Sequence, residues 1–588
     1  DGITPAVDDD GILRFASPAG KMLDSSLICW QVIEGEIVPR TAEYLIEEGS
    51  VRIAVEEYDP GYELVIDPEL VYLSHFGEGD DDHDHVNIKV RNIGASNDIL
   101  QSEDDDVITN FYHNTTLPFE IEMFNSNTIQ IAPLNPEFQV YNQKRPNFLL
   151  DDSEEDYYYG YVPSPIDLSH LKGKKIESTH TRSALSYSQQ YDLRNLDKVT
   201  PVKNQGSDGN CWAFATYASL ESYLLPEEEW DFSENNMKNL LKPNYDHGFD
   251  FYEGGNAWMS TAYLTRWSGP VREEDDPYKI RSTYSPMHLQ PVKLVQNVHF
   301  LPERGDFLDN TNIKWALTEL GAVQISMFWK SSYFNSNTNS FYNNQNLNSN
   351  HAVTIIGWDD TFPRTNFIIQ PPGDGAFIVK NSWGTGWGDE GYFYISYYDV
   401  SLQNAVIFTA VDTSVYNGIY QHDPLGWVGN IGFNSETAWF ANIFIADQHE
   451  VISGVAFYTP VLNAEYEIYI YIDPTEGPLS EGNVASIAEG TIHTPGYHII
   501  DIPAVEVAEG QSFSAVVHLH TPEYNYPIAI EHPLYWYSSK ATALPGDSYI
   551  SQDGIEWSDI TEHINNANIC LKVFTLVRES PSADFVAR

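Results

Sequence analysis

The pattern of apolar and polar residues changes character along the 588-residue chain. Before residue 76, apolar runs such as SLICWQVI and SVRIAVEEYD alternate with turn residues, and this two-residue period predicts antiparallel strands. Between residues 415 and 576, runs such as YEIYIYID and SFSAVVHLH recur at regular spacing and predict an all-β sandwich. Both end regions are therefore expected to be β-rich.

The middle of the chain has helical periodicity first and strand-like runs afterwards. Apolar residues follow helical spacing in residues 210–225, 234–241, 258–267 and 312–320. The runs AVQISMF, HAVTIIGW, GAFIVKNSW and GYFYISYYD follow. Helices that precede strands predict an α+β unit with two lobes.

These patterns predict a multidomain protein. The polar stretch 177–190 is expected to be an exposed linker, open to proteases. We expect a β-rich N-terminal region (1–118), a segment that includes this linker (119–190), the α+β unit (191–412), the β-sandwich (413–578), and the start of a further domain or a tail (579–588).

The charge of the chain narrows the classes of partner. The sequence has 85 acidic and 31 basic residues, a net charge of −54. A strongly negative surface repels phosphate backbones, so we expect no nucleic acid partner. The acidic runs 77–84 and 103–106 are typical of solvated loops, and Ca²⁺ binding by them stays open because neither has EF-hand spacing.

The chain contains no apolar run of 18 residues, so no transmembrane helix is expected. It begins without the charged and apolar regions of a signal peptide, which fits either a cytosolic protein or an exported one whose signal has been removed. The aromatic, lysine-poor composition favours export, to the medium or the cell surface.

The three cysteines lie far apart and predict neither a disulfide framework nor a metal site. Cys29 and Cys570 lie in strand-like runs, where a free cysteine is usually a small buried hydrophobe. Cys211 instead stands where the glycine-containing loop QGSDGN becomes a predicted helix. The unpaired N–H groups of a helix start favour a thiolate, the reactive form of the side chain.

The residues around Cys211 fit nucleophilic catalysis. Gln205 offers a side-chain amide that, with the Cys211 backbone N–H, would form a two-donor oxyanion hole. A thiolate also needs a base and a group that orients the base. His351 begins HAVTIIGW, and Asn381 lies in VKNSWGTGWG, where Trp383 would shield an Asn–imidazole hydrogen bond from water.

Together, QGSDGNCWAF, HAVTIIGW and KNSWGTGWGDEGY resemble the papain family of cysteine peptidases. The resemblance implies that Cys211 is the nucleophile, His351 its base, Asn381 the orienting residue and Gln205 the oxyanion-hole glutamine. Residues 359–375 fit a loop inserted between two strands.

The resemblance also implies a substrate-binding wall. Gly254 and Gly255 of EGGN would bind an extended substrate backbone. Ala257, Trp258 and Ala352 would lie near the pocket for the second residue before the scissile bond. We count Gly254, Gly255, Trp383 and Ala352 as the substrate-binding residues.

The chain departs from the family at one crosslink. The family usually has a cysteine where this chain has Asp208, bridged to a cysteine where this chain has Tyr252. Both are missing, so the disulfide is absent. A carboxylate at position 208 is expected to raise the pKa of the nearby thiol.

The order of motifs YVPSPIDLSHLKG, YDLR and VTPVKNQG, with a β-rich region behind them, resembles archaeal and bacterial papain-like peptidases that carry a lectin-like domain. It implies a propeptide within 119–190 and a lectin-like domain at 413–578 that offers a site for carbohydrate. The helical pro-region of animal and plant relatives is not recognisable.

The sequence therefore predicts a secreted cysteine endopeptidase that hydrolyses proteins or peptides without a metal or cofactor. Self-assembly stays open. The alternative, from another class, is an extracellular structural or adhesive protein whose peptidase unit is a silenced scaffold.

Overall fold

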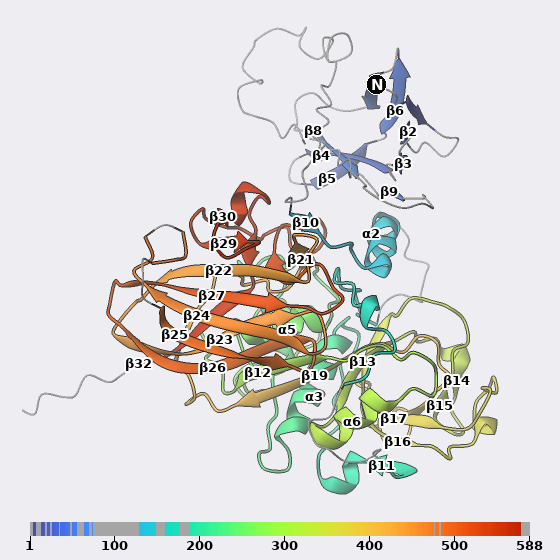
Figure 1. Ribbon diagram of the computed structural model, residues 1–588. Helices are drawn as coiled ribbons and strands as arrows, with labels where there is room; N and C mark the ends of the chain where they lie inside the picture. The colour runs from blue at the N-terminus through green and yellow to red at the C-terminus, as the bar shows by residue number, and fades with distance from the viewer. Residues whose placement is uncertain are drawn as a thin grey trace, which may run out of the picture. The chain divides into compact units, whose positions relative to one another are not determined.

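The structure, a computed structural model, describes residues 129–148, 159–176, 187–475, 477–480 and 484–577, together with the strands between Thr4 and Ser74. The chain forms two compact units, residues 1–128 and 129–588 (Figure 1). The acidic runs 77–84 and 103–106, the tail 579–588, and residues 177–186 of the predicted linker lie outside the described residues.

The N-terminal unit contains strands, as the alternating pattern predicts. Its three sheets have the strand orders β1-β2-β3-β9, β5-β4-β8 and β6-β7. The strands are β1 (Thr4–Val7), β2 (Leu13–Ser17), β3 (Gly20–Leu23), β4 (Ser26–Ile33), β5 (Glu36–Arg40), β6 (Ala42–Glu47), β7 (Ser50–Val55), β8 (Leu64–Glu69) and β9 (Leu73–Ser74). Cys29 lies in β4, and its side chain is outside the described residues.

The second unit confirms the four helices and four strands predicted for its middle part. The helices are α3 (Cys211–Leu224), α4 (Glu234–Leu240), α5 (Ala257–Thr265) and α6 (Thr311–Glu319). The strands are β13 (Val323–Met327), β16 (His351–Asp359), β17 (Ala376–Lys380) and β18 (Tyr392–Ser396). Helix α3 is buried on nearly every face, which explains its uniformly apolar composition. The inserted loop lies between β16 and β17, as expected.

A 13-stranded sheet runs from this α+β part into the C-terminal strands. Its order is β14-β15-β18-β17-β16-β13-β19-β12-β26-β23-β32-β20, with β11 paired to β16. The further strands are β11 (Gln190–Asp192), β12 (Leu294–Phe300), β14 (Phe334–Asn335), β15 (Ser340–Phe341), β19 (Gln403–Val411), β20 (Gly418–Tyr420), β23 (Glu450–Thr459), β26 (Gly496–Val507) and β32 (Leu571–Val577). The periodicity marks each strand but not its partner, so the sequence did not indicate that the two parts share a sheet.

The C-terminal part is a β-sandwich, as predicted. A six-stranded sheet, β25-β24-β27-β22-β29-β30, covers the C-terminal strands of the long sheet, and apolar residues such as Phe440 and Phe457 fill the space between them. Its strands are β22 (Thr437–Ile445), β24 (Ala464–Ile472), β25 (Val484–Ile492), β27 (Ser512–His520), β29 (Ser548–Ser551) and β30 (Ser558–Asp559). A smaller sheet joins β10 (Gln130–Ile131), β21 (Gly429–Gly432), β28 (Ile528–Glu531) and β31 (Asn568–Ile569). Cys570 is buried, as expected.

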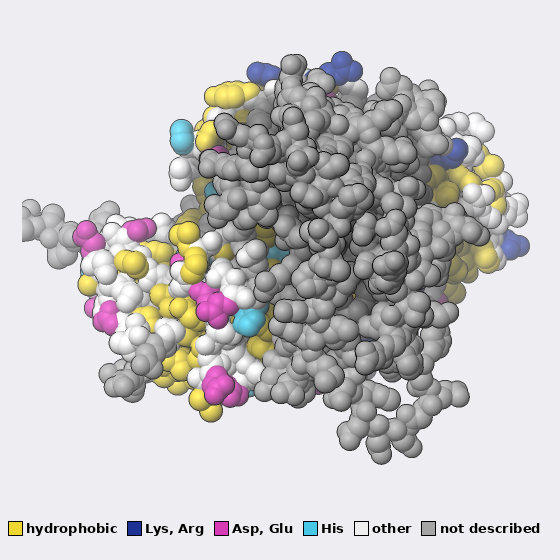
Figure 2. Space-filling model, turned by 90° about the horizontal axis from the view of Figure 1, so that it is seen from above, with side chains coloured by type: hydrophobic (Ala, Val, Ile, Leu, Met, Phe, Trp, Pro, Cys, Tyr) yellow, Lys and Arg dark blue, Asp and Glu magenta, His cyan; other side chains and the backbone are white. Residues whose placement is uncertain are grey.

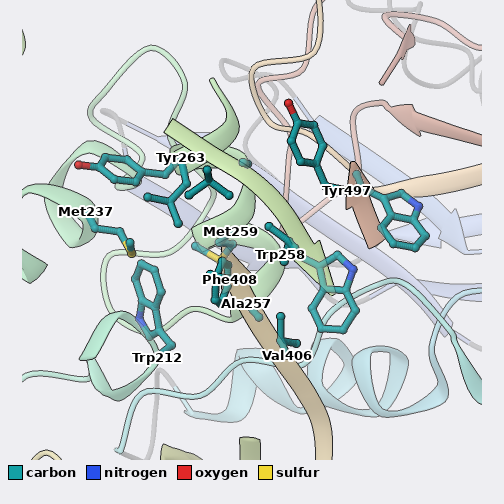
Figure 3. Packing of buried hydrophobic residues seen from close by; sticks show 14 of the residues in the cluster. Trp212, Met237, Ala257, Trp258, Met259, Tyr263, Val406, Phe408 and Tyr497 are labelled. Atoms are coloured by element: carbon teal, nitrogen blue, oxygen red, sulfur yellow. The ribbon is translucent and has the colours of Figure 1, made fainter. Parts of the chain in front are cut away.

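One apolar core joins the helices to both parts of the long sheet (Figure 3). Side chains from α3, α5, β19 and β26 meet in it: Trp212, Ala257, Trp258, Met259, Val406, Phe408 and Tyr497. The short 3₁₀ helices are η1 (Ser169–Leu171), η2 (Leu193–Leu196), η3 (Ser331–Tyr333), η4 (Arg364–Asn366) and η5 (Ile560–Glu562).

Helix α2 (Pro136–Phe148) was not predicted. It has no apolar periodicity. Its start is fixed by Asn135, whose side chain accepts from the Glu137 N–H at 3.0 Å, and by Pro136, which needs no backbone donor there. The buried Phe138 then packs edge-on against Tyr537, with ring centroids 5.5 Å apart. Gln403 Nε2 also donates to the Glu137 carboxylate at 2.7 and 2.8 Å, so long-range contacts stabilise a helix that lacks apolar periodicity.

Two histidines, the partly buried His299 and the buried His498, lie where the α+β part meets the sandwich. Strands β12 and β26 pair there, with Asn297 opposite His498 and His299 opposite Gly496. The two imidazole centroids are 5.5 Å apart. Burial lowers the pKa of His299 to about 4, and burial together with the neighbouring His299 lowers the pKa of His498 to about 3.

We expect the free energy of unfolding to decrease as the pH falls below 6.5, the ordinary histidine pKa. In that range the unfolded chain gains protons while both rings stay neutral, which costs about 1.4 kcal/mol per pH unit for each histidine. Denaturant unfolding at stepped pH measures this, and H498N should flatten the dependence, whereas the exposed-site control H493N should not. Equal pH dependence in the two variants would contradict the assignment.

Candidate active site

Cys211 is the first residue of α3, and its side chain is fully buried. Its Sγ accepts a hydrogen bond from the backbone N–H of Ala352 at 3.3 Å. Ala352 follows His351 at the start of β16. The start of the buried helix and the start of the strand therefore bring the predicted nucleophile beside the residue that follows the predicted base.

His351 is also fully buried and makes one side-chain hydrogen bond. Its Nε2 donates to Asn381 Oδ1 at 2.9 Å. Because that acceptor keeps the proton on Nε2, the neutral ring has its lone pair on Nδ1, which has no partner among the described residues. Trp383 stacks on the imidazole at 4.7 Å between centroids and 20° between planes, covering the His–Asn pair as predicted.

Both reactive groups are neutral in this state. Burial raises the pKa of the Cys211 thiol to about 12, against the opposing effect of the backbone N–H groups of Ala352, Trp212 and Cys211 itself. Burial lowers the pKa of His351 to about 4, against the opposing effect of Asn381. The expected thiolate is therefore wrong for this closed state, because desolvation of the sulfur outweighs the helix start.

Gln205 is held by three side-chain hydrogen bonds. Its Oε1 accepts from Ser382 Oγ at 2.6 Å, and its Nε2 donates to the carbonyls of Asp208 at 2.7 Å and Tyr159 at 3.2 Å. Sequence reasoning missed Ser382, although it directly follows Asn381 in the motif. The amide that was predicted to bind an oxyanion thus already binds a carbonyl of the chain itself.

Residues 159–162 lie across the predicted substrate cleft. The Tyr159 ring lies 5.6 Å from the His351 ring and 5.4 Å from the Trp383 ring, between centroids. Gly255 donates its N–H to the Gly160 carbonyl and accepts from the Val162 N–H, each at 3.0 Å. This pairing is parallel, with Tyr161 opposite Gly255.

The two wall residues Gly254 and Gly255 need to be glycine. A Cβ on Gly255 would lie 2.5 Å from the Trp212 ring. Gly254 has φ +90°, and a Cβ there would lie 2.8 Å from Val162 Cγ2. Any side chain on the wall would displace Trp212 or the backbone that pairs with Gly255.

At position 208, one of the two positions of the missing disulfide, the chain has an ion pair with Lys238 instead. Asp208 is buried and accepts from Lys238 Nζ at 2.5 Å and from the Arg281 N–H at 2.8 and 2.9 Å. Tyr252, at the position of the other family cysteine, is 67% exposed. Lys238 compensates the carboxylate, and the raised thiol pKa comes from burial, so the predicted effect of Asp208 on Cys211 is wrong.

We expect K238M to lower the free energy of unfolding by roughly 3–5 kcal/mol, because it leaves the charge of the buried Asp208 carboxylate without its cation. The double variant D208N/K238M should recover most of that loss, since it removes both charges. Denaturant unfolding of the full chain measures both, with K172M as a lysine control outside the pair. A double variant no more stable than K238M would mean that packing of the lysine, not its charge, is what matters.

Among the described residues, no group of three or more His, Cys, Asp or Glu side chains is placed to hold a metal ion. The helices of the described part are all too short or too polar to span a bilayer.

Comparison with known families gives three matches. Residues 187–410 match the papain family cysteine protease model, residues 419–575 the lectin like domain model, and residues 3–69 a domain of unknown function, DUF7948. A cysteine protease of the mite Blomia tropicalis is 25% identical over 42% of this chain and 73% of its own length. A viral cathepsin of Epiphyas postvittana nucleopolyhedrovirus is 30% identical, and the chain spans 58% of its length.

Solved structures agree with these matches. The cysteine protease and lectin-like domains of Cwp84, a surface layer associated protein of Clostridium difficile, align over 77% of this chain and 100% of theirs, with 26% identity and a TM-score of 0.64. Clostridial Cwp84 after propeptide cleavage aligns over 66% of this chain and 100% of its own, with 27% identity and a TM-score of 0.60. The chain therefore contains a papain-family cysteine protease domain followed by a lectin-like domain.

Proposed function

We propose that the protein is an endopeptidase that cleaves peptide bonds through Cys211, His351, Asn381 and Gln205. The observation that carries this proposal is the His351–Asn381 hydrogen bond of 2.9 Å, which leaves the Nδ1 lone pair free while the Cys211 sulfur binds the adjacent Ala352 N–H. His351 first takes the thiol proton, and the resulting Cys211 thiolate, paired with the imidazolium, attacks the scissile carbonyl. The resulting imidazolium protonates the leaving amine, and the ring then activates water to release the acyl group.

Gln205 and the Cys211 backbone N–H hold the oxyanion in this mechanism. The Gln205 amide is already oriented by Ser382 and by the Asp208 carbonyl. Preorganised donors of this kind contribute about 2.7–4 kcal/mol each to transition-state stabilisation. The contact of Nε2 with the Tyr159 carbonyl supports this role, because a carbonyl oxygen is the group that the hole is built to receive.

We propose that the segment within residues 119–190 is a propeptide that keeps the enzyme inactive. The Tyr159 carbonyl lies at Gln205, and the residues that come after it in the chain, 160–162, lie along the glycine wall. In a productive substrate, the residues that come before the scissile carbonyl would lie along this wall. The segment therefore runs in the wrong direction for acyl transfer. Its burial of Cys211 and His351 also disfavours the ion pair that attack requires.

The lectin-like domain contributes to holding this segment. Strand β10 pairs with β21, and the His170 ring stacks on Tyr524 at 4.1 Å between centroids. Lys174 Nζ also lies 2.7 Å from Glu523 Oε2. These contacts tie both ends of 129–176 to the sandwich, so we propose that a cut after residue 176 alone does not free the cleft at once.

The acidic composition and the likeness to a surface layer associated protein support export, with proteins or peptides outside the cell or at its surface as substrates. The one observation that favours the silenced-scaffold alternative is that residues 159–162 occupy the cleft. The two hypotheses differ in whether Cys211 becomes reactive once residues 159–162 have left the cleft.

An epoxysuccinyl thiol-peptidase probe distinguishes the two. We expect slow labelling of Cys211 in the intact chain and fast labelling after limited proteolysis near 177–186 and removal of the released segment. Opening the cleft removes the desolvation that raises the thiol pKa to about 12, so the pH profile of labelling should move to lower pH. C211A is the control for other thiols. No labelling of Cys211 at any stage favours the scaffold.

We propose carbohydrate as a second ligand, bound by the lectin-like domain. Trp439 of β22 is half-buried on the face opposite Phe440, and it stacks on His518 at 4.3 Å, with Tyr469 at 5.8 Å. The left part of the face seen in Figure 2, over the C-terminal strands, presents carboxylates among hydrophobic side chains, and the Lys and Arg side chains in view lie at the top and right. A neutral or basic glycan suits such a surface better than an anionic one.

A glycan array tests the carbohydrate proposal. It should use the full-length C211A chain, because the sandwich shares a sheet with the protease domain and an isolated sandwich would lack β12, the strand that pairs with β26. We expect retention of at least one neutral or basic glycan, weakened by W439A and not by the remote control W536A. An array without binding, or equal loss in both variants, contradicts a carbohydrate site at Trp439.

A further inference from the structure

The side chain of Tyr161 fills a pocket beside the cleft. It is 7% exposed and belongs to the same buried cluster as Ala352 and Trp258. At the floor of the pocket, Asn404 Nδ2 donates a hydrogen bond to the Tyr161 hydroxyl oxygen at 2.9 Å. Burial raises the pKa of this phenol, so it is neutral, and the pocket holds an uncharged aromatic ring with a recognised hydroxyl group.

The backbone conformation of β19 orients the Asn404 side chain toward this hydroxyl. Between β13 and β19, Gln324 pairs with Val406 while Ser326 pairs with Gln403, so the intervening residues of β19 form a bulge. Bulges of this kind redirect side chains next to active sites. Asn404 has φ +54°, a left-handed conformation that asparagine tolerates better than most residues.

The strand geometry does not by itself require an amide. A glycine would meet the left-handed φ at lower cost. The Asn404 amide makes two contacts, with the Tyr161 hydroxyl and, at 3.2 Å, with Ser326 Oγ. Both contacts lie at the pocket, so the role of the amide is to bind the side chain that occupies the pocket.

The pocket lies where a bound substrate would place one of its side chains. The Tyr159 carbonyl binds the Gln205 amide, and Tyr161, two residues along, pairs with Gly255. A substrate would place its scissile carbonyl at Gln205 and would run along Gly255 in the direction opposite to that of residues 159–162. The second residue before the scissile bond would then lie in the pocket that Tyr161 fills. We propose, resting on the proposed peptidase function, that Asn404 makes this pocket selective for tyrosine in the substrate.

A basic side chain is the main competitor. A cavity of about 200 Å³ lies beside Asn404 and is lined also by Phe300, Glu137 and Glu303. Glu137 belongs to α2 and would leave with the propeptide, so Glu303 is the carboxylate that remains. Arginine and lysine have no acceptor for the Asn404 N–H, whereas a phenol oxygen accepts it. The donor at the floor therefore favours tyrosine over a cation.

The first test uses the intact chain and a double-mutant cycle. Y161F removes only the hydroxyl, and N404G removes the amide while keeping the left-handed backbone. Each should loosen the segment and speed probe labelling of Cys211 by roughly threefold to tenfold, the effect of one neutral hydrogen bond. The double variant should be no faster than either single variant, because both remove the same bond. N434G, an asparagine with φ +54° in the lectin-like domain, is the matched control.

The second test uses the full chain after propeptide cleavage and four peptides that differ only in the second residue before the scissile bond: Tyr, Phe, Arg or Leu. We expect kcat/KM for tyrosine to exceed that for phenylalanine by roughly threefold to tenfold, and N404G to bring this ratio close to one. A ratio near one in the unmodified chain, or preference for arginine, overturns the inference while leaving the peptidase intact. Cleavage of none of the peptides, with no labelling of Cys211, refutes the proposed function instead.

Discussion

Two backbone hydrogen bonds to Gly255 determine the state of the protease domain. They hold Gly160 and Val162 along the glycine wall and so place Tyr159 over His351 and Trp383. The Cys211 sulfur and the His351 imidazole are both fully buried in this arrangement, and burial is the main cause of the displaced pKa values of both groups. The wall can make this main-chain contact only because it is glycine, since a Cβ on Gly255 would meet the Trp212 ring and a Cβ on Gly254 would meet the Val162 side chain.

The lectin-like domain is part of the structure around the cleft. Strands β12 and β26 continue one sheet from one domain to the other. Tyr537 of the C-terminal part packs edge-on against Phe138 of α2, and its hydroxyl lies 3.2 Å from Asn256 Oδ1. Asn256 in turn caps α5 through the Met259 N–H at 3.0 Å, directly after the glycine wall. The sandwich, helix α2 and the residue that follows the glycine wall therefore meet at one aromatic side chain, Tyr537, so displacement of α2 would expose apolar surface of the sandwich as well.

The sequence predicted the features that depend on residues close together in the chain. Helix α3 and strand β16 have clear periodicity, and the motifs around Cys211, His351 and Asn381 have a spacing that the fold brings together. It did not predict α2, which depends on long-range contacts such as that between Phe138 and Tyr537. It also did not predict the partner of Asp208, because Lys238 lies 30 residues away with no motif around it. Asn404 was also missed, since a bulge shows no signal in a strand pattern. The thiol pKa was misjudged for a related reason: a helix start is local, whereas burial of the sulfur depends on residues distant in sequence, such as Ala352, 141 residues later.

The Asp208–Lys238 pair stabilises the loop before Cys211 in a different way from a disulfide. A disulfide would stabilise the loop before Cys211 by constraining the unfolded chain, whereas an ion pair acts only in the folded state and needs a well-matched buried site. The hydrogen bonds from Lys238 and from the Arg281 N–H provide such a site. In exchange, the loop contains no second sulfur within reach of Cys211, and the other described cysteine, Cys570, is buried in the sandwich. The position of this loop therefore depends on charge and hydrogen bonding in the folded state rather than on a covalent link.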